Sequence, residues 1–142
     1  MAAIDPDSTR LIQAVINNDI SAVNRLLDRG VSPNAVTNRW KQSSLWFAAL
    51  RGHYDILVDL LRYGATIDAR DWDGTTPLFM ASQEGREVCV AALLDAGADT
   101  ELARRGDGER PLGVAARKGH QEVVELLVRR GARVNQVSQL SR

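Results

Sequence analysis

The sequence predicts an all-α fold, a solenoid of four helix-turn-helix repeats with projecting hairpin-like loops. A 23-residue segment recurs four times at a spacing of 33–34 residues, and this period is typical of stacked helical repeats. Each copy contains two short runs of small and apolar residues with the periodicity of a helix. The stretches that connect the copies are mostly polar and rich in turn-forming residues.

The first helix of a copy has its clearest start signal in the third copy, TPLFMASQEGREVCVAALLDAGA at 76–98. Pro77 suits the first turn of a helix, where its missing N–H is harmless. Thr76 precedes it and can accept a hydrogen bond from the exposed amides of that turn. We therefore predict that this Thr-Pro pair begins a helix. It does not belong to a phosphate-binding loop, since the chain has no G-x-x-x-x-G-K-[ST] string.

Glycines mark the ends of the predicted helices. Gly85 follows the first helix of the third copy, as Gly52 and Gly119 do in their copies, and glycine tolerates the left-handed cap conformation. The second helix of each copy stops at a glycine that keeps the repeat spacing: Gly30, Gly64, Gly97 and Gly131. Asp71, Asp73 and Gly74 then form a turn signal, which predicts a loop.

The motif DGTTPLFMASQEG, followed by LLDAGAD, resembles the D-x-x-G-x-T-P-L-H-x-A-A-x-x-G-H…L-L-x-x-G-A-D pattern of the ankyrin-repeat family. The resemblance covers about residues 8–137 and implies stacked helix pairs with loops at right angles to them. Trp46, Phe79 and Gly113 replace the histidine of that pattern, so the family's Thr–His hydrogen bond is lost in each of these copies. We expect a single domain over 1–142, with repeats at about 5–37, 38–70, 71–104 and 105–137 and a short tail at 138–142.

The composition excludes several classes of protein. Eighteen basic and eighteen acidic side chains balance, so no general nucleic-acid or anionic-membrane surface is expected. The single cysteine, Cys89, cannot form an internal disulfide and fits a reducing compartment. The N-terminus lacks a signal peptide, and no apolar run is long enough to span a membrane. We expect an intracellular protein, cytoplasmic before nuclear, with no direct membrane insertion.

Residues capable of catalysis or metal binding do not cluster in the sequence. His53 and His120 are 67 residues apart, and each follows a helix-ending glycine, which favours a place in a turn. Cys89 falls on the inward side of a helix, where a buried packing thiol is expected. We therefore predict no catalytic residue, no cofactor and no metal site, and a chain that is not an enzyme.

The resemblance implies a recognition surface made of the loop tips and the outward side of each first helix. The register of the Thr-Pro pair carries the family's variable contact positions over to this chain. They are Arg39, Trp40, Gln42, Leu50 and Arg51 in the second copy, Trp72, Asp73, Thr75, Gln83 and Glu84 in the third, and Asp107, Glu109, Arg117 and Lys118 in the fourth.

Two tryptophans, Trp40 and Trp72, fall on neighbouring loop tips. Interface hot spots are enriched in tryptophan, so the indoles are either partner anchors or packing between adjacent repeats. Trp46, in contrast, is expected to be structural. Leu50 would add an apolar contact, while Arg51, Arg117 and Lys118 would receive acidic groups. The expected partner is another protein or peptide with acidic and apolar groups, and not a nucleic acid.

The charges and the C-terminal copy leave alternatives open. Residues 71–103 hold seven acids and one arginine, whereas residues 104–137 hold eight bases and four acids. This polarity either orients a partner or reflects complementary packing of adjacent repeats. EVVELLV at 122–128 is as apolar as an internal copy, which suggests further repeats or self-association at this end. The alternative function is therefore a structural, targeting or regulatory segment of a larger multidomain protein.

Overall fold

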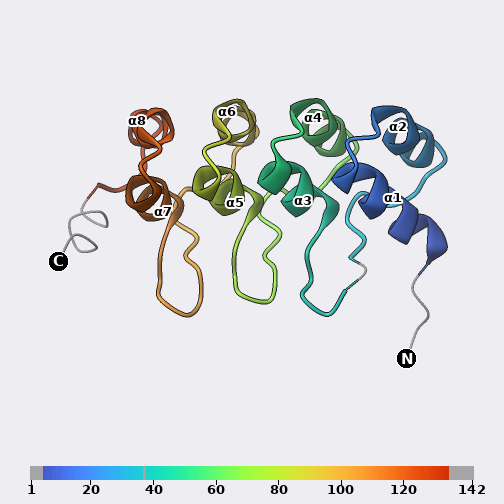
Figure 1. Ribbon diagram of the computed structural model, residues 1–142, viewed down its shortest axis with the longest axis horizontal. Coiled ribbons are helices and arrows are strands. Elements are labelled where there is room, and N and C mark those ends of the chain that lie inside the picture. The colour runs from blue at the N-terminus through green and yellow to red at the C-terminus, as the bar shows by residue number, and fades with distance from the viewer. Residues whose placement is uncertain (1–4, 37, 135–142) are drawn as a thin grey trace.

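The computed structural model describes residues 5–36 and 38–134, and within them the predicted all-α solenoid of four helix pairs is confirmed. One row of helices lies next to the loops, and the other row lies on the opposite side of the first row from the loops (Figure 1). Three long loops project side by side (Figure 1). The helices next to the loops are α1 (Pro6–Ile16), α3 (Ser44–Arg51), α5 (Pro77–Gln83) and α7 (Pro111–Lys118). The helices of the outer row are α2 (Ile20–Asp28), α4 (Tyr54–Arg62), α6 (Glu87–Asp95) and α8 (Gln121–Arg129).

Helix α5 begins at the predicted cap, and α3 begins at an equivalent one. The hydroxyl of Thr76 accepts the N–H of Phe79 at 3.1 Å, and that of Ser43 accepts the N–H of Trp46 at 3.2 Å. Pro77 occupies the first helical position of α5. The Thr-Pro pair is therefore a helix start, as the sequence predicts. Arg110, at the equivalent place before α7, supplies no side-chain cap.

The glycines between paired helices adopt the left-handed conformation, with φ of +74° at Gly52, +70° at Gly85 and +78° at Gly119. Gly85 also lies against the next repeat, because a Cβ there would be 2.7 Å from Nδ1 of His120. The Nε2 atom of His120 is 2.9 Å from the carbonyl oxygen of Gln83. The histidine therefore lies in the predicted turn and links two successive repeats.

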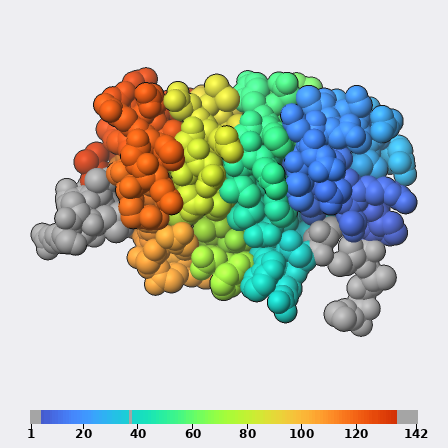
Figure 2. Space-filling view, in the orientation of Figure 1, coloured from blue at the N-terminus to red at the C-terminus, as the bar shows by residue number. Residues whose placement is uncertain are grey.

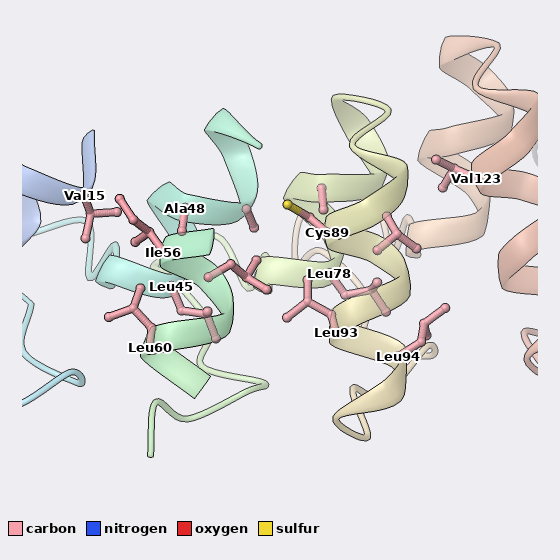
Figure 3. Close-up of a cluster of buried hydrophobic side chains, with 14 of the residues drawn as sticks. Val15, Leu45, Ala48, Ile56, Leu60, Leu78, Cys89, Leu93, Leu94 and Val123 are labelled. Atoms are coloured by element: carbon pink, nitrogen blue, oxygen red, sulfur yellow. The ribbon is translucent and has the colours of Figure 1, made fainter. Parts of the chain in front are cut away.

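A continuous apolar core runs along the stack between the two rows of helices. Figure 3 shows side chains from successive repeats in this core, Leu45, Ile56, Leu78 and Leu93 among them. Cys89 is fully buried here, and burial raises the pKa of its thiol to about 11. The cysteine is thus an uncharged packing group at neutral pH, as predicted.

Trp46 belongs to a second apolar cluster, next to the loops, with Phe79, Met80 and Val114. Its indole N–H donates to the hydroxyl of Thr75 in the following repeat at 3.0 Å. The structural role expected of Trp46 is confirmed, and its hydrogen bond joins the second repeat to the third.

A polar acceptor after Gly30, Gly64 and Gly97 joins one repeat to the next. Asn34, Asp68 and Glu101 occupy equivalent positions, and each accepts a backbone N–H from the following repeat. The distances are 2.7 Å to Thr66, 3.1 Å to Asp99 and 3.3 Å to Arg133. A polar residue at the repeat spacing is the sequence signal for this series, although asparagine, aspartate and glutamate share no simple motif.

Candidate protein-interaction surface

The second and third loops have the same turn at their tips. Oδ1 of Asp71 accepts the N–H groups of Asp73 at 3.0 Å and Thr75 at 2.8 Å. Oδ1 of Asn38, 33 residues earlier, accepts those of Trp40 at 3.1 Å and Gln42 at 3.3 Å. A side chain that bonds the backbone two residues ahead holds a turn in place. The prediction that Asp71 shapes this loop is confirmed, and Asn38 does the same work in the second loop.

The fourth repeat carries one extra residue in its loop tip. The N–H of Asp71 donates to the carbonyl of Thr75, four positions ahead, whereas the N–H of Arg104 donates to that of Glu109, five positions ahead. The 34-residue spacing before the fourth copy therefore arises inside the loop. Arg105 is the structural counterpart of Trp72, a match that the register of the Thr-Pro pair misplaces by one residue.

Hydrogen bonds join the three loop tips into one edge. The N–H of Trp72 donates to the carbonyl of Trp40, and the N–H of Arg105 donates to that of Asp73, both at 2.8 Å. The guanidinium of Arg105 also donates to the carbonyl of Trp72 at 2.9 Å. Gly74 permits this approach, since a Cβ there would be 2.8 Å from Cγ of Arg105. The loops therefore support one another although each projects from the stack (Figure 2).

Trp40 and Trp72 form an exposed pair on this edge. Their ring centroids are 5.2 Å apart with an interplanar angle of 53°, a tilted contact typical of aromatic pairs. The guanidinium of Arg39 lies 4.7 Å from the centroid of Trp40. Trp40 is nevertheless 40% exposed and Trp72 51% exposed. The indoles thus pack across adjacent repeats and still present apolar surface; we name Arg39, Trp40 and Trp72 the aromatic shelf.

The contact positions on α3 and α5 differ in how accessible they are. Leu50 is half-buried and packs against the cluster around Trp46. Arg51 is exposed and forms no hydrogen bond or ion pair with the described part of the chain. Gln83 is half-buried, Glu84 is exposed, and the amide of Gln83 donates to the Glu84 carboxylate at 3.1 Å. Among these contact positions on α3 and α5, Arg51 therefore carries the charge that has no partner in the described part of the chain.

Arg117 already has an acidic partner in its own repeat. Its guanidinium donates to both oxygens of Glu109, at 3.0 and 2.8 Å, and Glu109 is only 3% exposed. Glu109 also accepts from Arg104 at 3.0 Å. Lys118, the next contact position on α7, is exposed and forms no such bond within 5–36 and 38–134. Lys118 is therefore a better candidate than Arg117 for receiving a partner's carboxylate.

Thr75 does not lie on the surface where the family register places it. It is 5% exposed, and its hydroxyl accepts the indole N–H of Trp46. The replacement of the family's histidine by a tryptophan gives this threonine a buried role, so it is removed from the candidate contact residues. Gln42 and Asp73 are half-buried within the turns at the loop tips, whereas Glu109, the counterpart of Thr75 in the fourth loop, is buried and is removed from the contact residues as well.

The opposed charges of the third and fourth repeats are partly paired with each other. Arg130 forms an ion pair with Asp95, and Nε of Arg133 is 4.0 Å from Oε1 of Glu101. The polarity of the sequence therefore contributes to packing between these repeats.

Within 5–36 and 38–134, no three His, Cys, Asp or Glu side chains converge as metal ligands would. No helix in the same ranges is long and apolar enough to cross a membrane.

Two sequence models of the same protein family match this chain. The sequence model of ankyrin repeats in three copies matches residues 11–104, and that of a single ankyrin repeat matches residues 107–139. The chain is 35% identical over 98 residues to the inactive serine/threonine-protein kinase TEX14 of Bos taurus, which covers 69% of this chain and 6% of that protein. It is 34% identical over 131 residues to the E3 ubiquitin-protein ligase XB3 of Oryza sativa subsp. japonica. That match covers 60% of this chain and 29% of the ligase.

A third relative is the 2-5A-dependent ribonuclease of Mus musculus, which is 36% identical over 75 residues. That match covers 53% of this chain and 10% of the ribonuclease. The chain thus spans less than a third of the length of each of these relatives.

Proposed function

Because the chain belongs to the ankyrin-repeat family, we propose that it is a non-catalytic module that binds a peptide or folded protein along its loop tips and adjacent helices. Repeat solenoids use such continuous surfaces for recognition, and ankyrin repeats in general are protein–protein interaction modules. The binding surface would be the aromatic shelf together with Leu50, Arg51 and Lys118. In this role the chain acts as an intracellular scaffold or adaptor, and the cytoplasm is the proposed compartment.

The aromatic shelf carries this proposal. Trp40 and Trp72 keep about half of their surface exposed although each already contacts the other. Tryptophan is enriched at the centre of interfaces, where an apolar body is desolvated by the partner. The hydrogen bonds between loop tips hold both indoles in place, so binding would cost little ordering entropy.

The charges around the shelf favour a partner with carboxylates beside an apolar group. Arg51 and Lys118 are exposed and lack a hydrogen-bond or ion-pair partner among the described residues, and Lys41 at the second loop tip is also exposed. The exposed acids on the same side are Glu84, which accepts from Gln83, and Asp107, which pairs with Arg104. A partner that places its acids over α3 and α7, away from Glu84, would meet the complementary charge.

A second proposal is that the chain works as a structural, targeting or regulatory segment of a larger protein. It is supported by the short coverage of the relatives, in which the matched region is between 5% and 29% of the protein. The two proposals are compatible, since a binding segment can recruit or regulate a neighbouring domain.

The binding proposal is tested by selecting peptides from a random display library on the purified chain. Synthetic copies of the selected peptides are then measured against Trp40→Ala/Trp72→Ala, and we expect binding at least about tenfold weaker. Tyr63→Ala is the matched control, because Tyr63 is an exposed aromatic residue outside the shelf. Unchanged affinity for the double variant, with an unchanged circular dichroism spectrum, would remove the shelf from the binding surface.

A further inference from the structure

Helix α6 lacks the polar side that a surface helix normally has. Its residues 88–94, VCVAALL, are all apolar, whereas a helix at the surface of a globular protein keeps polar residues on its outward side. The neighbouring outer helices are interrupted by charges, at Asp59 in α4 and at Glu125 in α8. As a result Val88 is 61% exposed, and Ala91 and Ala92 are only half-buried.

This apolar side of α6 borders a hollow next to α4. The hollow measures about 290 Å³ and is lined by Tyr54, Val88, Ala91, Ala92 and Asp95. This volume is many times the roughly 30 Å³ that one water molecule takes in the liquid. The hollow is therefore large enough for a large apolar side chain. The two helices are neighbours in the outer row, on the far side of the stack from the loop tips (Figure 1). We name this hollow the outer groove.

Two exposed carboxylates are sequence neighbours of residues that line the outer groove. Asp55 is next to Tyr54 in the sequence, Glu87 is next to Val88, and both are exposed. Neither carboxylate forms a hydrogen bond or ion pair within the described ranges. Two nearby bases are paired with acids, Arg62 with Asp59 at 3.3 Å and Arg130 with Asp95, whereas Arg86 keeps its charge and donates to the carbonyl of Leu50 at 3.2 Å. An apolar floor beside the unpaired carboxylates of Asp55 and Glu87 is complementary to an apolar side chain flanked by bases.

We propose that the outer groove is a second docking site, which takes one large apolar side chain from a protein segment that carries lysine or arginine on either side of it. The site lies apart from the aromatic shelf and does not depend on it. A chain with both sites holds two partners at once, an acidic one at the loop tips and a basic one on the outer helices.

The test uses random displayed peptides selected in parallel on the wild-type chain and on Tyr54→Ala/Val88→Ser. Both side chains are exposed, so the variant should keep its circular dichroism spectrum and melting temperature. We expect a class of peptides that is lost on the variant and has a large apolar residue with Lys or Arg nearby. Synthetic members of this class should bind the variant about tenfold or more weakly. They should bind Asp55→Asn/Glu87→Gln more weakly and with less dependence on salt.

Two controls separate the outer groove from other surfaces. Val128→Ser removes an exposed valine from α8 and should leave the affinity unchanged. Trp40→Ala/Trp72→Ala should also leave it unchanged, so failure of the shelf proposal is distinguished from failure of this one. The proposal is overturned if no peptide class depends on Tyr54 and Val88, or if the dependent class is acidic. It is equally overturned if sedimentation shows a dimer that the groove variant abolishes, because the occupant is then a second copy.

Discussion

At the scale of the residue, a lysine in the second loop does what glycine does in the other two. Lys41 has φ of +59°, and its counterparts Gly74 and Gly108 have φ of +82° and +71°. A side chain in the left-handed region costs about 1–2 kcal/mol from the approach of Cβ to the following carbonyl. The side-chain oxygen of Asn38 accepts hydrogen bonds from the N–H groups of Trp40 and Gln42, on either side of Lys41, and these bonds keep the turn in this conformation.

Replacing this lysine should stabilise the protein. We expect Lys41→Gly to raise the free energy of unfolding by about 0.5–1 kcal/mol, since relief of strain exceeds the entropy that glycine adds to the unfolded chain. Urea denaturation followed by circular dichroism measures the change. Lys118→Gly is the matched control and should be destabilising, because Lys118 lies in α7, where glycine is a poor helix former. Loss of stability in Lys41→Gly would show that this turn is not strained.

Single residues were predictable where one physical requirement decides their role. A threonine before a proline and a glycine after an apolar run are dictated by helix ends, and Thr76 and Gly85 behave accordingly. Thr75 was not predictable as a buried residue, because its environment comes from Trp46 in the preceding repeat. Arg117 raises the same difficulty, since its carboxylate partner Glu109 lies in the loop.

At the scale of the element, the fourth loop is stabilised by charge in addition to the backbone turn. Arg104 donates to both oxygens of Asp107, at 3.2 and 2.8 Å, and also contacts Glu109. The hydrogen bond from Arg104, followed by the N–H of Glu109, lowers the pKa of Asp107 from 3.8 to about 2. Its folded pKa is therefore below its unfolded value, so the stabilisation is complete above about pH 4 and is lost as the pH falls towards 2.

This loop should make the stability of the protein depend on pH in the acid range. We expect Asp107→Asn to have a lower free energy of unfolding than the wild type, by a constant amount between pH 5 and 8. The difference should be below about 1 kcal/mol because Asp107 is exposed. The difference should shrink between pH 4 and 2, measured by urea denaturation at each pH. In an Arg104→Gln background the same substitution should show little pH dependence. A difference that stays constant down to pH 2 would exclude Arg104 as the cause.

The register of this loop marks the limit of prediction at the scale of the element. The periodicity determines the helices, because each must bury an apolar side at a fixed angle to its neighbour. A loop is not bound by that period, so the extra residue could lie anywhere between Gly97 and Arg110. Only the hydrogen bonds show that it lies between Arg104 and Glu109, and that Arg105 corresponds to Trp72. The sequence placed the two tryptophans of the aromatic shelf on neighbouring loops and left open whether they pack; their contact with each other is seen only in the structure.

At the scale of the whole molecule, the stack is held by contacts that recur between each repeat and the next. The three glycines between paired helices, Gly52, Gly85 and Gly119, occupy equivalent positions where these contacts can be compared. A Cβ at Gly85 would be 2.7 Å from the His120 ring, and one at Gly52 would be 2.7 Å from the flexible Cδ of Arg86. A Cβ at Gly119 would have nothing within 4 Å. An alanine side chain would therefore contact the His120 ring at Gly85 and the flexible Arg86 side chain at Gly52, and would lie in open space at Gly119.

We expect Gly85→Ala to destabilise the chain by about 2–3 kcal/mol, from backbone strain together with displacement of His120 and loss of its bond to Gln83. Gly119→Ala should cost only about 1 kcal/mol, the strain alone. Denaturation of both variants, and of each combined with His120→Ala, measures the gap, which should close once the ring is absent. The comparison also tests the expectation that something covers the C-terminal end. If a second copy packs there as Gly85 meets His120, Gly119→Ala should cost as much as Gly85→Ala and should weaken self-association in sedimentation equilibrium.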